Sequence, residues 1–173
     1  MAGGRPNPQQ LRKWFDAIDK DGNNELTAVE LQAALQLGNL NFSLATVAHI
    51  IRIHDKTGSG TINFEEFGKL HEFLTNVQQS FEYFDKDRSN SLNYDEILCA
   101  LQHAGYKLDP PAMKVVFNRF DPSRSGSLQL TEFLALTLFM RSATATFNAF
   151  DANRAGTINV NFNQFLYCAA HCI

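Results

Sequence analysis

Oxygen-bearing side chains recur at a fixed spacing in residues 19–30 of this chain. Counted from the first aspartate, they fall at positions 1, 3, 5, 9 and 12, occupied by Asp19, Asp21, Asn23, Thr27 and Glu30. Position 7, Glu25, needs to offer only its backbone carbonyl. Calcium is a hard cation that takes about six to eight oxygen ligands, and a loop that ends in a bidentate glutamate can wrap them around it. These residues therefore predict the binding of a calcium ion.

The same pattern recurs four more times, with leucine or isoleucine at position 8 of every copy. Loop one spans 19–30, and loops two to five span 55–66, 85–96, 121–132 and 151–162. Five copies in register exclude a chance match and indicate EF-hand calcium loops. The candidate ligands in loops two to four are Asp55, Thr57, Ser59, Thr61 and Glu66; Asp85, Asp87, Ser89, Ser91, Asn93 and Glu96; and Asp121, Ser123, Ser125, Ser127 and Glu132.

Helices must flank each loop to hold its ligands, and the loop spacing indicates how those helices are shared. The loops start alternately 36 and 30 residues apart. The shorter interval leaves room for one helix of about 27 Å and no turn. We therefore expect one continuous helix over 64–84, between loops two and three, and another over 130–150, between loops four and five. The predicted fold class is all-α, with five helix-loop-helix hands and short β-bridges between paired loops.

The N-terminal part of the chain predicts the helix that enters loop one. Its apolar residues lie three and four positions apart: Leu11, Trp14, Phe15 and Ile18. We expect Trp14 to pack in the core, and Asn7 to cap this helix with Pro8 at the first helical position. Residues 1–10 contain several glycines and prolines and are expected to be a short disordered segment, whereas 11–173 form the domain.

The number of carboxylates ranks the five loops. Loops one and three each place three around the ion, and loops two and four each place two. Because affinity rises with ligand charge, loops one and three should bind first, and loops two and four should bind weakly or serve mainly as their structural partners. Loop five has Ala155 at position 5 and Phe162 at position 12, so no calcium is expected there. At position 6 of loop one, Asn24 replaces the usual glycine and can still adopt the left-handed conformation.

An odd number of hands leaves one without a partner in the chain. The apolar residues at position 8 should pair loop one with loop two and loop three with loop four, through short antiparallel contacts. Ile158 of loop five then has no partner, and the segment that follows it is apolar, with Phe162 and Phe165 among its residues. A two-fold contact between fifth hands would bury this surface in a homodimer, and a heterodimer with a related protein would use the same surface.

The loop count, the alternating spacing and the degenerate fifth loop resemble the penta-EF-hand family from residue 11 onward. The resemblance implies dimers that form through the fifth hand. It also implies target proteins with proline-rich or hydrophobic segments, held in a groove between helices. We expect the connector 103–108 and its flanking helices to form a wall of that groove, because a rigid proline-rich segment suits a groove lined by aromatic side chains.

Composition limits the remaining possibilities. A net charge of −3 argues against a nucleic-acid partner. Three cysteines form no disulfide framework and suit the reducing cytoplasm. Cys168, His171 and Cys172 match no standard zinc spacing. No segment predicts a signal peptide or a membrane span.

Three functions remain to be weighed. The first is a cytoplasmic calcium sensor and adaptor, which exposes a hydrophobic surface on binding calcium and recruits target proteins or membranes. The second is a regulatory subunit of a calcium-dependent cysteine protease, whose catalytic chain would pair with the fifth hand. The third is a calcium buffer, whose hands would barely open. No enzyme activity is expected, because the five histidines are scattered and no nucleophile lies in a recognisable setting.

Overall fold

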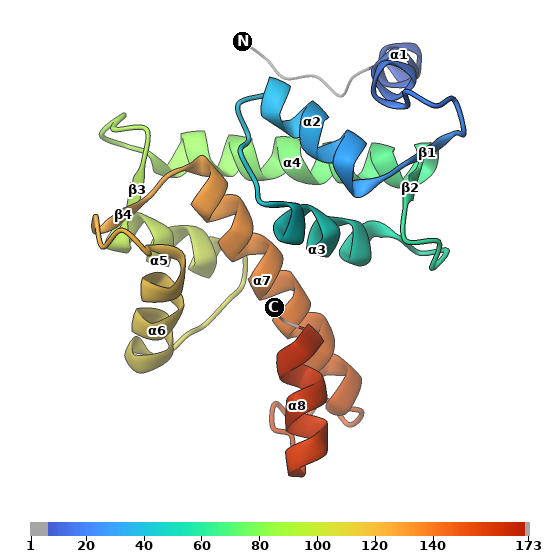
Figure 1. Ribbon diagram of the computed structural model, residues 1–173. Coiled ribbons are helices and arrows are strands. Elements are labelled where there is room, and N and C mark those ends of the chain that lie inside the picture. The colour runs from blue at the N-terminus through green and yellow to red at the C-terminus, as the bar shows by residue number, and fades with distance from the viewer. Residues whose placement is uncertain (1–6, 172–173) are drawn as a thin grey trace.

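The computed structural model describes residues 7–171 of the chain, which fold into a mostly helical structure (Figure 1). Four two-residue strands lie between the helices: β1 (Glu25–Leu26), β2 (Ile62–Asn63), β3 (Leu92–Asn93) and β4 (Ser127–Leu128). The helices within the described residues are α1 (Pro8–Ile18), α2 (Ala28–Leu37), α3 (Leu44–His54), α4 (Phe64–Phe84), α5 (Tyr94–His103), α6 (Pro110–Phe120), α7 (Leu130–Phe150) and α8 (Phe162–His171). This architecture confirms the predicted fold class.

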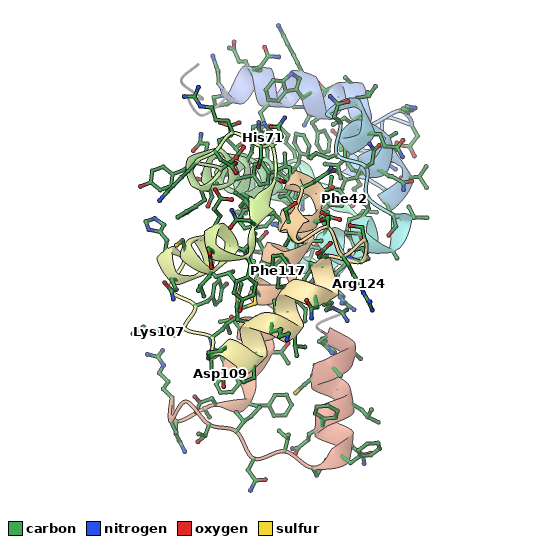
Figure 2. All side chains as sticks on the ribbon, turned by 90° about the vertical axis from the view of Figure 1, so that its left-hand side faces the viewer. Phe42, His71, Lys107, Asp109, Phe117 and Arg124 are labelled. Carbon is green, nitrogen blue, oxygen red and sulfur yellow. The ribbon has the colours of Figure 1, made fainter. Side chains whose placement is uncertain are left out.

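Side-chain caps set the starts of the helices that enter the loops. Asn7 Oδ1 accepts a hydrogen bond from Gln9 N at 3.1 Å, and α1 begins at Pro8, as predicted. Residues 8–10 are therefore helical, which corrects the expectation of disorder for that part of 1–10; residues 1–6 lie outside the described residues. Asp109 caps α6 in the same way, accepting from Ala112 N at 2.8 Å. Figure 2 shows Asp109 at this end of α6 and Lys107 in the connector before it.

Short antiparallel ladders join the loops in pairs. Leu26 lies opposite Ile62 between β1 and β2, and Leu92 lies opposite Leu128 between β3 and β4. All four side chains are fully buried, so each ladder anchors two loops to the core. This register confirms the predicted pairing of loop one with loop two and of loop three with loop four. Within residues 7–171, no strand pairs with the segment around Ile158.

Two long helices connect the hands. Both α4 and α7 have the bounds expected from the loop spacing. The buried residues of α7 lie on more than one face but end at Ser142, and none of residues 143–150 is buried. Figure 1 shows this second half of α7 extending away from the rest of the molecule, with α8 beside it. The fifth hand is therefore carried outside the main core.

One apolar core runs through hands one to four, and aromatic side chains pack against one another within it and at its edge. Phe15 is fully buried and packs edge-on against Phe64 and Phe67 of α4. Trp14 is instead 40% exposed and stacks on His71, with ring centroids 5.2 Å apart, so the core position expected for it is wrong. Among the described residues, no helix is both long and apolar enough to cross a bilayer.

Candidate metal centre

Loops one and three each gather three carboxylates. In loop one, one oxygen from each of Asp19, Asp21 and Glu30 lies within 4.8 Å of the other two. Asp85, Asp87 and Glu96 form the equivalent group in loop three. Both groups contain carboxylates without histidine or cysteine, which is the donor set that a hard divalent cation prefers. The geometry of both loops therefore fits calcium.

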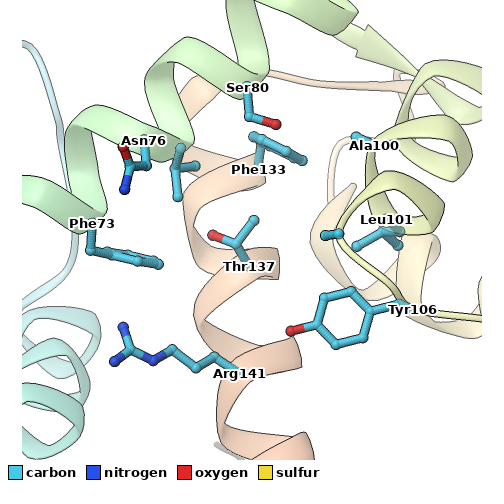
Figure 3. A pocket seen from close by; sticks show the side chains of 11 residues that line it. Phe73, Asn76, Ser80, Ala100, Leu101, Tyr106, Phe133, Thr137 and Arg141 are labelled. Atoms are coloured by element: carbon cyan, nitrogen blue, oxygen red, sulfur yellow. The ribbon is translucent and has the colours of Figure 1, made fainter.

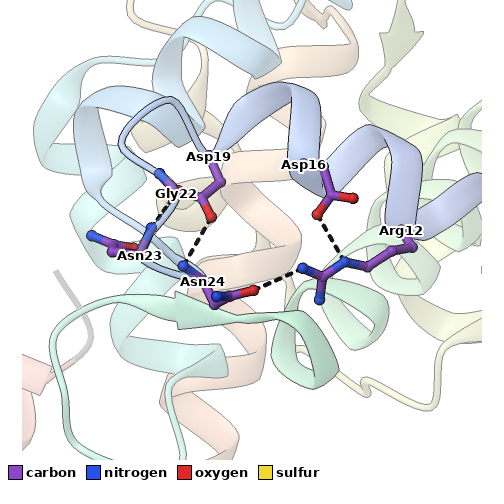
Figure 4. Close-up of polar contacts among 6 residues, drawn as sticks. All are labelled: Arg12, Asp16, Asp19, Gly22, Asn23 and Asn24. Atoms are coloured by element: carbon purple, nitrogen blue, oxygen red, sulfur yellow. Dashed lines mark hydrogen bonds and ion pairs between the residues drawn. The ribbon is translucent and has the colours of Figure 1, made fainter.

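The first aspartate of each loop organises the backbone around it. Asp19 Oδ1 accepts from Gly22 N at 2.9 Å, and its Oδ2 accepts from Asn24 N at 2.9 Å (Figure 4). The bond from position 6 to Oδ2 recurs in every other loop: Gly60 to Asp55 at 2.8 Å, Asn90 to Asp85 at 3.0 Å, Gly126 to Asp121 at 2.8 Å and Gly156 to Asp151 at 2.8 Å. Position 1 therefore shapes the backbone of each loop.

Two positions of every loop adopt a left-handed backbone. Position 6 has a positive φ in all five loops, including 62° at Asn24, which confirms that asparagine takes the place of glycine there. Position 4 also has a positive φ, and in loops three to five it is occupied by Arg88, Arg124 and Arg154. Sequence reasoning missed position 4, because arginine gives no sign of a left-handed conformation.

The glutamate at position 12 ties the two ends of its loop together. Glu30 Oε1 accepts from Lys20 N at 3.0 Å, and Oε2 accepts from Thr27 N at 3.0 Å. The Thr27 hydroxyl oxygen in turn accepts from Glu30 N, which completes a capping box at the start of α2. The same box is formed in loops two and three by Glu66 and Glu96, and in loop four Glu132 Oε2 accepts from Gln129 N at 2.8 Å. Each predicted bidentate ligand is thus held in place by the helix it starts.

Hydrogen bonds also keep several carboxylates ionised. The backbone N–H of Thr27, followed by its hydroxyl, lowers the pKa of Glu30. The N–H of Gly60 lowers the pKa of Asp55, and the hydroxyl and N–H of Ser89 lower that of Asp87. At Asp121, burial acts to raise the pKa, but hydrogen bonds led by those from Gly126 N and Ser125 N outweigh it and lower the pKa. Low pKa values leave these groups charged and ready for a cation at neutral pH.

Asn24 of loop one is held from outside the loop. Its Oδ1 accepts a hydrogen bond from an Arg12 guanidinium nitrogen at 2.7 Å, and Arg12 Nε pairs with Asp16 Oδ1 at 2.7 Å (Figure 4). The same guanidinium lies 5.1 Å from the centroid of the Phe64 ring. Arg12 therefore links the left-handed turn of loop one to α1 and α4. Neither the loop pattern nor helical periodicity pointed to this residue.

Loop five differs from the prediction in length. The helices that leave loops one to four begin at position 10, but α8 begins at Phe162, two residues later than that. Its start is capped by Asn161 and Gln164, since Asn161 N donates to Gln164 Oε1 at 2.9 Å and Gln164 N donates to Asn161 Oδ1 at 3.0 Å. The predicted end at 162 is therefore corrected: Gln164 stands where the other loops have glutamate, and an uncharged amide replaces the carboxylate.

The structure places every predicted ligand of loops one to four within its own loop. Loops two and four carry hydroxyls at positions 3 and 5: Thr57 Oγ1 donates to Asp55 Oδ1 at 3.0 Å, and Ser125 Oγ donates to Asp121 Oδ1 at 3.2 Å. In loops two and four, these hydrogen bonds hold the predicted ligand oxygens close to one another. The assignment of individual ligands and the ranking of the loops stay predictions.

Comparisons with known proteins agree with this geometry. A family model described as an EF-hand domain pair matches residues 8–70 and 74–138. Peflin from Danio rerio is 32% identical over 165 residues, which cover 94% of this chain and 61% of that protein. Human peflin is 30% identical over 173 residues, with 98% of this chain and 61% of peflin covered. This chain thus spans about three fifths of the length of these two relatives.

This chain covers a larger share of sorcin from Mus musculus than of peflin. Sorcin is 30% identical over 162 residues, which make up 91% of this chain and 81% of sorcin. Among solved structures, a homolog of programmed cell death 6 protein from Leishmania major Friedlin superposes with a TM-score of 0.72 at 30% identity, and the match covers 100% of both chains. The similarity therefore extends over the whole five-hand arrangement.

Proposed function

Since the chain belongs to the penta-EF-hand family of calcium-binding proteins, we propose that it is a calcium sensor and adaptor. In this proposal, calcium reorients the helices that flank the loops, and an apolar groove between them takes a segment of a target protein. The observation that carries the proposal is a groove of about 230 Å³ between α4, α5 and α7.

The groove is lined mainly by apolar side chains (Figure 3). Phe73 of α4 lies on one side and Tyr106 of the α5–α6 connector on the other, with Phe133 of α7 at the base. Tyr106 belongs to the connector 103–108 that the sequence suggested as a groove wall. Arg141 of α7 lies at the rim, with its guanidinium 5.3 Å from the centroid of the Phe73 ring.

Each wall of the groove leads directly to a calcium loop. Helix α4 leaves loop two and enters loop three, α5 leaves loop three, and α7 leaves loop four. Any change in the angle between these helices alters the width of the groove, because α4, α5 and α7 supply most of its lining. This continuity supports a coupling between calcium binding and target binding.

The lining suits a rigid, apolar peptide segment whose backbone carbonyls need hydrogen-bond donors. Aromatic rings at Phe73, Tyr106 and Phe133 can pack against prolines, whose fixed φ lowers the entropy lost on binding. The Arg141 guanidinium offers donors to peptide carbonyls at the rim. We therefore propose proline-rich or hydrophobic segments as the targets, held in this groove.

Binding of the dye 8-anilinonaphthalene-1-sulfonate tests the sensor function. Adding calcium to the calcium-free protein should raise the dye fluorescence, and Tyr106→Ala should reduce that rise. Tyr83→Ala is the matched control, because Tyr83 is a tyrosine of α4 that is 70% exposed and does not line the groove. A protein that binds calcium without any rise in fluorescence would be a buffer. An equal loss in both variants would place the apolar surface elsewhere.

We propose further that the fifth hand pairs with the fifth hand of a second copy or of a related chain. From Phe162 to His171, no residue of α8 is buried, and the exposed residues include Phe162 at 72% and Phe165 at 57%. Ile158 precedes them without a strand partner among residues 7–171. Monomeric proteins rarely expose a large apolar surface of this kind. A two-fold symmetric contact would bury the same apolar surface of α8 on both copies.

The proposed place of action is the cytoplasm, with recruitment to membranes when calcium is bound. Cys99 and Cys168 are free thiols, which suits a reducing compartment. Cell fractionation in calcium and in chelator tests this proposal. It predicts a soluble fraction in chelator and a membrane-bound share in calcium; the same distribution in both conditions would contradict the membrane step.

A further inference from the structure

The side chain of Glu25 leaves its own loop and reaches into loop two. In loop one, only the backbone carbonyl of Glu25 is a predicted ligand, so its carboxylate is available for another contact. Glu25 Oε2 accepts a hydrogen bond from Thr61 Oγ1 at 2.7 Å. The β1–β2 ladder sets this contact, because it places Glu25 opposite Asn63, two residues after Thr61.

The contact continues into the predicted ligands of loop two. Thr61 Oγ1 lies 2.8 Å from Ser59 Oγ, and Thr57 Oγ1 lies 3.2 Å from Ser59 Oγ and 3.0 Å from Asp55 Oδ1. These residues occupy positions 7, 5, 3 and 1 of the loop. Hydrogen bonds thus connect a carboxylate of loop one through Thr61 to Ser59, and the single Thr57 proton bonds either to Ser59 or to Asp55.

The carboxylate gives these hydrogen bonds a direction. A hydroxyl has one proton, and an ionised carboxylate only accepts. If Thr61 donates to Glu25, its oxygen is left to accept the proton of Ser59. The Ser59 proton then bonds to the Thr61 hydroxyl, and when Thr57 donates to Asp55 the lone pairs of the Ser59 oxygen are available to a cation. A cation needs its serine ligand in that orientation.

Loop four lacks this arrangement. Ser91 stands at the position of Glu25 and Ser127 at that of Thr61, and neither supplies a carboxylate. Ser125, the position-5 residue, donates instead to Ser127 O at 2.7 Å or to Asp121 Oδ1 at 3.2 Å. Both acceptors are predicted calcium ligands. The Ser125 proton therefore occupies an oxygen that the ion requires. The Ser59 proton instead has the Thr61 hydroxyl at 2.8 Å, closer than the Thr61 carbonyl oxygen at 3.5 Å, and position 7 needs to offer the ion only that carbonyl.

We propose that Glu25 is a positioning residue for the calcium site of loop two, acting through Thr61 on Ser59. It orients the serine ligand and adds a third carboxylate near the predicted ligands of loop two, among which only Asp55 and Glu66 supply carboxylates. Loop two therefore binds calcium more tightly than loop four, although each contributes two carboxylates. The proposal rests on calcium binding by these loops, which is part of the proposed function.

Backbone NMR of the whole chain can follow each loop separately during a calcium titration. The amides at position 6 are suitable reporters, because each donates to the first aspartate of its loop: Gly60 in loop two and Gly126 in loop four. Wild type should fill loop two before loop four. Glu25→Gln should weaken loop two by about three- to tenfold, the size expected when one exposed charge is lost and the hydrogen bond from Thr61 is weakened, because the glutamine amide can donate as well as accept.

Two variants separate the hydrogen-bond chain from a simple charge effect. Thr61→Val removes the linking hydroxyl but keeps the Glu25 charge, and should weaken loop two to a similar extent. The double variant Glu25→Gln/Thr61→Val should then lose little more than either single one. Glu65→Gln is the matched control: it removes an exposed carboxylate next to Glu66 that bonds to Lys69 and not to Thr61. Ser91→Glu should strengthen loop four.

A calcium-free measurement completes the test. Glu25→Gln should shift the Ser59 and Thr61 amide resonances of the calcium-free protein while its circular dichroism is unchanged. Equal affinities of loops two and four in wild type, additive losses in the double variant, or an equal loss in Glu65→Gln would overturn the proposal. Those results would leave the sensor function intact if loops one and three still bind. Failure of all four loops to bind calcium would instead refute the proposed function.

Discussion

Truncation of Phe165 should break the proposed dimer of fifth hands. Phe165 lies on the exposed face of α8 and has no role in any calcium loop. Phe165→Ala should therefore leave the fold and calcium binding of the monomer intact while it weakens self-association. The matched control is Leu37→Ala on α2, because Leu37 is a large apolar residue that is 90% exposed and lies outside the fifth hand.

The size of the effect follows from the exposed area. Phe165 is 57% exposed, and a phenylalanine presents about 200 Å², so a dimer can cover about 110 Å² of each copy. At about 25 cal/mol per Å², this burial is worth close to 3 kcal/mol per copy as an upper value. Alanine keeps part of that area, so we expect a loss of about 2 kcal/mol per copy. The two copies together then weaken Kd about 10³-fold.

Sedimentation equilibrium over a range of protein concentrations measures this Kd, in chelator and in calcium. Wild type and Leu37→Ala should form particles of twice the chain mass, whereas Phe165→Ala should dissociate at concentrations where they do not. A Kd for Phe165→Ala within threefold of wild type would refute the reasoning. A wild-type protein that is monomeric at every concentration would refute the homodimer and leave a heterodimer to be tested by copurification.

Three further predictions concern the loops and one buried histidine. Arg12→Ala should weaken calcium binding at loop one and lower the unfolding free energy of the calcium-free protein by about 1 kcal/mol, measured by urea titration, because Asn24 loses its outside support. Calorimetric titration should show two tight sites that disappear in Glu30→Ala and Glu96→Ala; four comparable sites would show that carboxylate number does not set affinity. Burial lowers the pKa of His54 from 6.5, so the unfolded chain takes up a proton first. The unfolding free energy should therefore fall as pH drops below 6.5, and His54→Gln should reduce that slope.

Several features were predictable because they depend on short stretches of sequence. An EF-hand loop places its ligands by local geometry, so the positions of Asp19 and Glu30 follow from residue type and spacing alone. The helix bounds of α4 and α7 follow from the distance between neighbouring loops. The pairing of Leu26 with Ile62 is also predictable, because each loop has one apolar residue at position 8 and two neighbouring loops can bury these residues by pairing.

Other features depend on contacts that spacing cannot reveal. The apolar periodicity of α1 predicts a buried face but not where that face ends, and Trp14 lies at its edge against His71. The two extra residues of loop five become visible only where α8 begins. Asn161 and Gln164 cap that helix, but asparagine and glutamine three residues apart are common on exposed surfaces and did not mark a helix start. Arginine at position 4 of three loops gives no sign of its left-handed backbone.

The sequence by itself determined that this chain has five EF-hands, which loops carry the carboxylates, and which hands share a helix. These properties are local, since each is fixed within about one loop and its flanking helices. Only the tertiary structure decided which side chains of different elements meet: Arg12 with Asn24, and Glu25 with Thr61. It also decided that α8 lies outside the core. Such contacts depend on strand register and helix packing across the whole fold, where one residue of displacement changes every partner.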